Sequence, residues 1–143
     1  MIDKGVICSK LSQLRERQKL LSELGSEPLD AFVAALIKVS AAERNLQVSI
    51  EICLDVGQHL IAALGLPRPD EYRDVFRILG AHGVIASDFA ARLEAMAGFR
   101  NRLVHAYAGI DARIVHAYLQ DERADFDEFG RQVAAFLATK AQG

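Results

Sequence analysis

Residues 42–67 read AERNLQVSIEICLDVGQHLIAALGLP, and this stretch decides the fold class. Its apolar side chains recur at alternating steps of four and three residues, which is the spacing of the packing stripe of a bundle helix. The same spacing continues upstream, so we expect one long helix from Pro28 to Leu64, ended by Gly65 and the prolines after it. The expected stripe is Phe32, Leu36, Val39, Glu43, Leu46, Ile50, Cys53, Gly57, Leu60 and Leu64.

Two residues of this stripe are unusual for a buried helix face. Gly57 lowers helix propensity by about 1 kcal/mol relative to alanine, which suggests that another helix approaches closely there. Glu43 places a carboxylate where a hydrocarbon is expected. It is either half of a salt bridge between helices or a supporting residue that orients functional groups, and the sequence leaves both alternatives open.

The rest of the chain also has helical periodicity. Glycines, prolines and capping residues divide it into expected helices at 2–24, at 71–79, from 87 to between 105 and 109, and at 111–139 with a kink near 121. The alternation typical of strands and repeats of about 20–50 residues are absent from the sequence. The sequence therefore predicts an all-α fold, an antiparallel bundle of four to five helices, formed by residues 1–143 as a single domain.

The composition narrows the class of protein. Of the residues, 51% are hydrophobic and 25% are charged, which is typical of a globular domain. The formal net charge of −2 excludes nucleic-acid binding through bulk positive charge, so any contact with RNA must be local. The two cysteines have no CxxC spacing and no apolar run reaches about 18 residues, so we expect a cytoplasmic protein without membrane contact.

Residues 99–107 read FRNRLVHAY and form the candidate functional motif. Arg100 interrupts the row of apolar residues that leads into this motif. A guanidinium on a core-facing row needs an anion or water, because an unpaired buried charge is very costly. Three partners for Arg100 are conceivable from the sequence: Glu43, Asp55 or a phosphate from outside the protein.

His105 adds acid–base chemistry to the motif. On a regular helix His105 lies about 140° around the axis from Arg100, whereas Tyr107 nearly eclipses Arg100. Arg100 and His105 can therefore converge if the helix unwinds at His105, or if a two-fold dimer brings two copies face to face. Histidine can transfer protons to and from the ribose and leaving oxygens, and arginine can bind the phosphate, so such a groove can cleave RNA without a metal ion.

The residues Arg100 to His105 resemble the Arg-x(4–6)-His motif of HEPN ribonucleases, including a polar residue, Asn101, directly after the arginine. Continued to Tyr107, the motif resembles that of the HepT toxins, the HEPN partners of minimal nucleotidyltransferase (MntA) antitoxins. Residues 42–67 and the order of the expected helices are similar to the same family along nearly the whole chain. The resemblance implies a metal-independent endoribonuclease toxin that uses no cofactor and acts as a homodimer, with its active groove between the protomers.

The resemblance also implies roles for single residues of the motif. Arg100 and His105 would be the catalytic pair acting on an RNA substrate, with Asn101 supporting them. A cognate MntA-like nucleotidyltransferase antitoxin would neutralise the toxin by transferring AMP onto Tyr107. An anionic phosphodiester beside Arg100 would repel or block an RNA phosphate, which gives the modification a physical basis.

Because the net charge is negative, RNA would have to be held by local arginines. Arg102 lies within the motif and is a supporting candidate, and Arg92 and Arg113 are further candidates. The acidic run at 121–128 is expected to lie away from RNA.

Other functions stay open from the sequence. The chief alternative is a non-catalytic HEPN-like helical module that binds a nucleotidyltransferase partner or a nucleotide in the same groove. The tetrapeptide VHAY recurs at 115–118 without an arginine at the required distance, so that copy is expected to be scaffold. His59 and His82 have no Cys, His or Glu at metal-ligand spacing, so no metal site is predicted.

Overall fold

The computed structural model describes residues 1–105 and 110–142, with 141 and 142 given by their backbone alone. The part of the chain so described contains no β-strand, which confirms the predicted all-α class. Its helices are α1 (Lys4–Gly25), α2 (Leu29–Ala34), α3 (Leu36–Ala63), α4 (Tyr72–Ala81), α5 (Ser87–Val104), α6 (Ala112–Asp121) and α7 (Ala124–Gln142).

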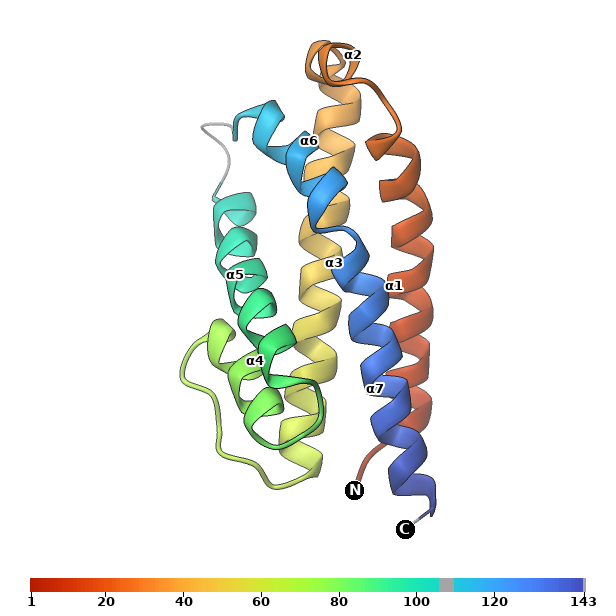
Figure 1. Ribbon diagram of the computed structural model, residues 1–143, viewed down its shortest axis with the longest axis vertical. Helices are drawn as coiled ribbons and strands as arrows, with labels where there is room; N and C mark the ends of the chain where they lie inside the picture. The colour runs from red at the N-terminus through yellow and green to blue at the C-terminus, as the bar shows by residue number, and fades with distance from the viewer. Residues whose placement is uncertain (106–109, 143) are drawn as a thin grey trace.

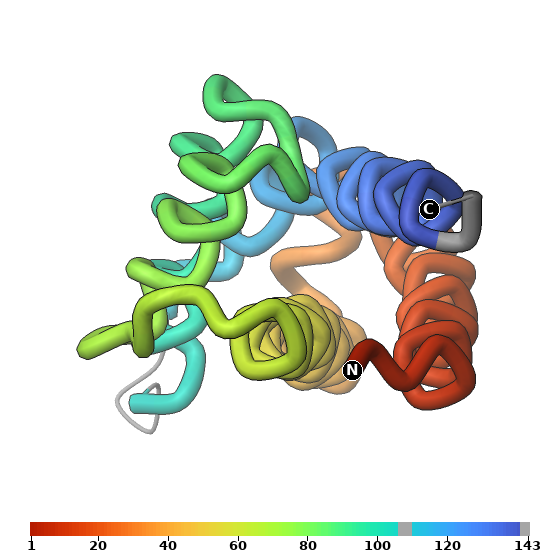
Figure 2. Tube along the Cα trace, turned by 90° about the horizontal axis from the view of Figure 1, so that it is seen from below, coloured from red at the N-terminus to blue at the C-terminus, as the bar shows by residue number. Residues whose placement is uncertain are grey.

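The long helices form an antiparallel bundle around α3. Figure 1 shows α1, α3, α5 and α7 running alternately up and down the long axis, with the two ends of the chain at the same end of the molecule. Helix α3 contacts α1 and α7 on one side and α4 and α5 on the other, and the end-on view shows the same arrangement (Figure 2). The short helices α2 and α6 contact each other near the opposite end of the bundle from the termini (Figure 1). None of the described helices is long and apolar enough to cross a bilayer.

The described residues form seven helices where the sequence predicted four to five, because two expected segments are each divided. The segment 28–64 breaks at Ala35, whose φ of −102° and ψ of 83° are not helical. Leu36, expected in the buried stripe, is therefore 76% exposed, and that prediction was wrong. The segment 111–139 divides after Asp121, where the sequence predicted a kink.

Most of the remaining stripe on α3 is buried as expected, whereas Glu43 and Leu64 are only partly buried. A Cβ added to Gly57 would lie 2.5 Å from Cγ1 of Val75, so α3 and α4 approach more closely there than a side chain allows. This confirms the close helix approach that Gly57 suggested. The ring of Phe76 on α4 meets that of Phe129 on α7 edge to face, with the ring centres 6.0 Å apart, and this contact joins the two helices in the core.

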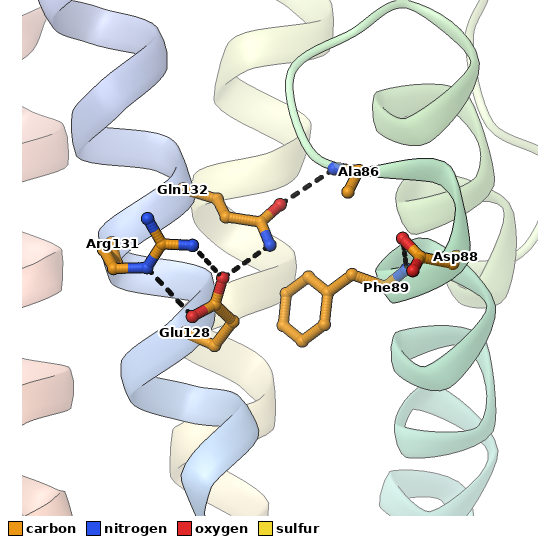
Figure 3. Close-up of polar contacts among 6 residues, drawn as sticks. All are labelled: Ala86, Asp88, Phe89, Glu128, Arg131 and Gln132. Carbon is orange, nitrogen blue, oxygen red and sulfur yellow. Dashed lines mark hydrogen bonds and ion pairs between the residues drawn. The ribbon is translucent and has the colours of Figure 1, made fainter.

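The start of α5 is attached to α7 by a chain of polar contacts (Figure 3). The backbone N–H of Ala86, directly before α5, donates to Oε1 of Gln132 at 2.8 Å. The amide nitrogen of Gln132 donates to Oε2 of Glu128 at 2.7 Å, and Arg131 forms an ion pair with the same carboxylate. These contacts fix the direction in which α5 leaves the loop, and α5 carries Arg100 at its other end.

Candidate active site

Helix α5 ends within the sequence motif. Its last helical residue is Val104, and His105 follows with φ −99° and ψ 24°, outside the helical range. The backbone N–H of His105 still donates to the carbonyl of Asn101 at 3.2 Å, so the chain leaves the helix at His105 itself. This is one of the two conditions under which Arg100 and His105 were expected to converge.

Arg100, Asn101 and His105 line one surface cavity of about 840 Å³. Three residues of the predicted site therefore line the same cavity, and His105 among them is exposed. The cavity is also lined by the loop before α4 and its first turn, by one polar side chain of α3 and by two small residues of α5. These further lining residues are Gln58, Pro69, Asp70, Glu71, Tyr72, Arg73, Ala97 and Gly98.

The guanidinium of Arg100 forms an ion pair with Glu51 of α3. Its Nη2 donates to Oε1 of Glu51 at 3.0 Å, and the two side chains are 18% and 33% exposed. The same oxygen of Glu51 accepts a hydrogen bond from the amide of Gln47 at 3.2 Å, one turn earlier on α3. Arg100 thus lies on the core-facing side of α5 as predicted, and the carboxylate of Glu51 compensates its positive charge.

The two carboxylates considered as partners of Arg100, Glu43 and Asp55, are not the one that it contacts, and a phosphate from outside stays a prediction. Glu43 lies eight residues before Glu51 on α3, about 12 Å along the helix axis, because each residue advances a helix by about 1.5 Å. Asp55, one turn after Glu51, pairs instead with Lys10 of α1 at 3.7 Å. Partial burial raises the pKa of the Glu43 carboxyl, and its supporting role stays a prediction.

Sequence reasoning missed both Glu51 and Tyr72. Glu51 follows the buried stripe residue Ile50 and lies one turn from Gln47, so a polar pair at helical spacing was the available signal. Tyr72 begins α4, and the carbon Cζ of Arg100 lies 4.8 Å from the centre of its ring. A guanidinium over an aromatic face is an attractive arrangement, and here it joins the end of α5 to the start of α4.

The other predicted site residues lie apart from the cavity or outside the described residues. Arg102 is exposed, and its Cζ lies 5.8 Å from the ring centre of Phe99 rather than in the cavity wall. Tyr107, the predicted site of modification, lies outside the described residues. Arg92, a candidate for RNA contact, forms a two-pronged hydrogen bond with the buried carboxylate of Asp125 at 2.8 and 3.3 Å.

The charges around the cavity are mixed. Arg73 and Arg100 line it together with Asp70 and Glu71, so the cavity is not a simple basic pocket. Within residues 1–105 and 110–142, His, Cys, Asp and Glu side chains do not gather in any group of three that could hold a metal ion. The cavity lining thus includes an ion-paired guanidinium and an exposed imidazole, groups that can bind a phosphate and transfer protons.

Comparisons with known proteins agree with this fold. Residues 11–133 match the family model described as "Ribonuclease HepT-like". The chain belongs to this family of HepT-like ribonucleases, which confirms the predicted resemblance and the predicted class of enzyme.

Two curated relatives have names that include an activity. The chain is similar to the "mRNA nuclease HepT" of Shewanella oneidensis, with 33% identity over 85 residues that cover 59% of the chain and 64% of the relative. It is also similar to the "tRNA nuclease HepT" of Aphanizomenon flos-aquae, with 23% identity over 138 residues that cover 96% of the chain and 94% of the relative.

Solved structures show the same fold. A tri-AMPylated HEPN toxin of Shewanella oneidensis in complex with an MNT antitoxin superposes with a TM-score of 0.81 and 26% identity, covering 91% of the chain and 97% of that protein. YutE from Bacillus subtilis, described as a cytosolic protein of unknown function, superposes with a TM-score of 0.84 and 21% identity, covering 97% and 93%.

Proposed function

We propose that this chain is the ribonuclease toxin of a toxin–antitoxin system, a metal-independent endoribonuclease that acts as a homodimer. The main support for the proposal is that Arg100, Asn101 and His105, at the end of α5, line the same cavity. Family membership and the names of the relatives support the reaction class. The likeness to a toxin bound to its antitoxin supports the biological setting.

The proposed reaction uses the ribose 2′-hydroxyl as the nucleophile. The 2′-oxygen attacks phosphorus, the bond to the 5′-oxygen of the next nucleotide breaks, and a 2′,3′-cyclic phosphate and a free 5′-hydroxyl result. One proton leaves the 2′-hydroxyl and one reaches the leaving oxygen, and imidazole groups can perform both transfers. Arg100 binds the phosphate oxygens and stabilises the charge that develops on them. A second protomer supplies the second imidazole.

Cleavage of RNA by the purified chain in EDTA tests the reaction. Arg100→Ala and His105→Ala should each lower the cleavage rate by about 100-fold or more, since each removes a group that acts in the transition state. Matched controls are Arg15→Ala on α1 and His82→Ala after α4, both exposed and both outside the cavity wall. Full activity of the His105→Ala protein, or loss of activity in EDTA, would contradict the proposal.

The homodimer is tested separately by light scattering coupled to gel filtration. The proposal expects the mass of two chains at the concentration at which RNA is cleaved. A monomer that cleaves RNA at the full rate would show that one protomer suffices. It would contradict an active site located between two protomers.

We further propose that a cognate nucleotidyltransferase of the MntA type neutralises the chain by transferring AMP from ATP to Tyr107. The step joins the tyrosine oxygen to the α-phosphorus of ATP and releases pyrophosphate. Incubation with ATP and the partner should add the mass of one or more AMP units and abolish RNA cleavage. Tyr107→Phe should keep cleaving RNA and gain no mass; modification of this variant at another residue would contradict the assignment.

A further inference from the structure

We propose that Glu51 is the positioning residue of this site, which holds the guanidinium of Arg100 in the direction that a scissile phosphate requires. The inference rests on the proposed ribonuclease function and adds a residue outside the sequence motif. It follows from three contacts at Arg100, which together restrain the guanidinium from different sides.

Glu51 restrains the edge of the Arg100 guanidinium and Tyr72 restrains its face. The 3.0 Å contact from Nη2 to Oε1 of Glu51 fixes the direction of one edge of the planar group. The ring of Tyr72, 4.8 Å from Cζ, limits tilting of that plane. A planar group held at one edge and one face keeps little rotational freedom, so the Arg100 side chain enters the reaction already ordered.

Glu51 is itself held in place. Gln47 donates to the same carboxylate oxygen at 3.2 Å from one turn earlier on the rigid helix α3. A side chain that positions another must have a fixed location of its own, because a freely rotating carboxylate would move with the arginine. The Glu51 side chain is one-third exposed, which leaves its pairing with Arg100 partly shielded from water.

The contacts to Glu51 and Asn101 leave donors of Arg100 available. A guanidinium has five N–H groups, two on each Nη and one on Nε. Nη2 uses one for Glu51 and Nη1 uses one for Oδ1 of Asn101 at 3.3 Å, which leaves one on each terminal nitrogen. Nε is buried and has no hydrogen-bond partner among the described residues. Arg100 can thus bind phosphate oxygens through two N–H groups without releasing Glu51.

The ion pair has opposite effects on binding and on catalysis. The carboxylate of Glu51 reduces the attraction of Arg100 for any phosphate, because it offsets the positive charge next to the cavity. It also orders the guanidinium before RNA binds, so less rotational freedom of Arg100 has to be lost when the transition state forms. A positioning role therefore predicts a lower rate of the chemical step without Glu51, with RNA binding unchanged or tighter.

Single-turnover cleavage by Glu51→Gln separates these two effects. This substitution keeps the size of the side chain and removes its charge. The first-order rate constant should fall by about 10-fold or more, while the half-saturating RNA concentration stays within about two-fold or decreases. Asp55→Asn is the matched control, since it removes another ion-paired carboxylate one turn away on α3 whose partner, Lys10, belongs to α1.

The outcomes distinguish the proposed roles. A rate constant unchanged by Glu51→Gln, with cleavage lost in Arg100→Ala, would overturn the positioning role and leave the ribonuclease function intact. A faster rate would also overturn it, and would show that Glu51 restrains Arg100 as an inhibitory counter-ion. A weaker RNA affinity at an unchanged rate would identify Glu51 as a binding residue and contradict the proposal. Absence of cleavage by the unaltered protein would instead contradict the proposed function.

Side-chain NMR tests the positioning of Arg100 without any reaction. In the unaltered protein, rotation of the Arg100 guanidinium about its Cζ–Nε bond should be slow, and in Glu51→Gln it should become fast. Asp55→Asn should leave this rotation slow. Equally slow rotation in Glu51→Gln would overturn the inference even for a protein that cleaves no RNA.

Discussion

The rings of Phe99 and Tyr118 stack face to face, with their centres 4.2 Å apart and their planes within 9° of parallel. Phe99 lies one residue before Arg100 on α5, and Tyr118 belongs to α6. The stack therefore anchors the C-terminal part of α5 to α6, directly beside the cavity wall. Partial burial raises the pKa of the Tyr118 hydroxyl, whose ring packs against the edge of the core.

Removal of this stack should lower the stability of the whole bundle. Tyr118→Ala should reduce the free energy of unfolding by about 2 kcal/mol, less than the cost of removing a fully buried ring, because Tyr118 is partly buried. Tyr118→Phe keeps the stack and should cost less than about 1 kcal/mol. Urea unfolding followed by circular dichroism measures both values. An alanine variant as stable as the parent would show that the stack contributes nothing to stability.

The second tetrapeptide VHAY is held by structural contacts. Nε2 of His116 lies 2.8 Å from the carbonyl oxygen of Glu27, and its ring lies 5.3 Å from that of Phe32. Both contacts join α6 to the chain around α2. They provide a packing explanation for His116 and Tyr118, in line with the expectation that this copy is scaffold.

The close approach at Gly57 gives a second prediction about stability. Gly57→Ala would place a methyl group 2.5 Å from Cγ1 of Val75 and 3.2 Å from Cδ1 of Leu79, so α3 and α4 would have to separate. We expect a loss of about 1–3 kcal/mol, as for other overpacked cores. Gly98→Ala on α5 is the matched control, because nothing lies within 4 Å of its added methyl group. It should be neutral or gain about 0.5–1 kcal/mol from better helix propensity.

The periodic sequence predicted the fold class, the long helices and the core-facing position of Arg100, because these depend on local spacing. It did not predict the break at Ala35, where neither proline nor glycine interrupts the pattern. It left the partner of Arg100 open and did not identify Glu51, because the level at which α5 packs against α3 determines which carboxylate faces Arg100. This level depends on packing between residues that are 49 positions apart in the sequence, and the spacing of apolar residues along one helix contains no information about it.

Arg92 is expected to have a structural role, in contrast to the catalytic role proposed for Arg100. Its guanidinium pairs with Asp125, a buried carboxylate, and contributes to a cluster with Glu122 away from the cavity. Arg92→Ala should lower the free energy of unfolding by about 1–3 kcal/mol, because the Asp125 carboxylate loses its partner. The rate of RNA cleavage under conditions where the variant is folded should stay within about two-fold of the parent. A large loss of cleavage with unchanged stability would return Arg92 to the list of RNA-binding residues.

The contacts between α7 and the start of α5 predict a pH dependence (Figure 3). Hydrogen bonds from Arg131 and Gln132 lower the pKa of Glu128 to about 2. Because this pKa lies below the ordinary value of about 4.3, the ionised carboxylate stabilises the folded state above pH 4–5, and that contribution disappears as the pH falls towards about 2. Glu128→Gln should therefore be less stable than the parent at neutral pH, and the difference should shrink through this acidic window.

Urea unfolding of the parent and Glu128→Gln at several pH values between about 3 and 7 measures this difference, and other acidic groups common to both proteins cancel in it. Arg131→Ala should show the same decrease in the stability difference at acidic pH, because it removes the hydrogen-bond donor that contributes most to the lowered pKa of Glu128. A stability difference that stays constant from neutral to acidic pH would show that the Glu128 carboxylate gains nothing from these contacts on folding. The link from Glu128 through Gln132 to Ala86 would then hold the start of α5 by packing rather than by charge.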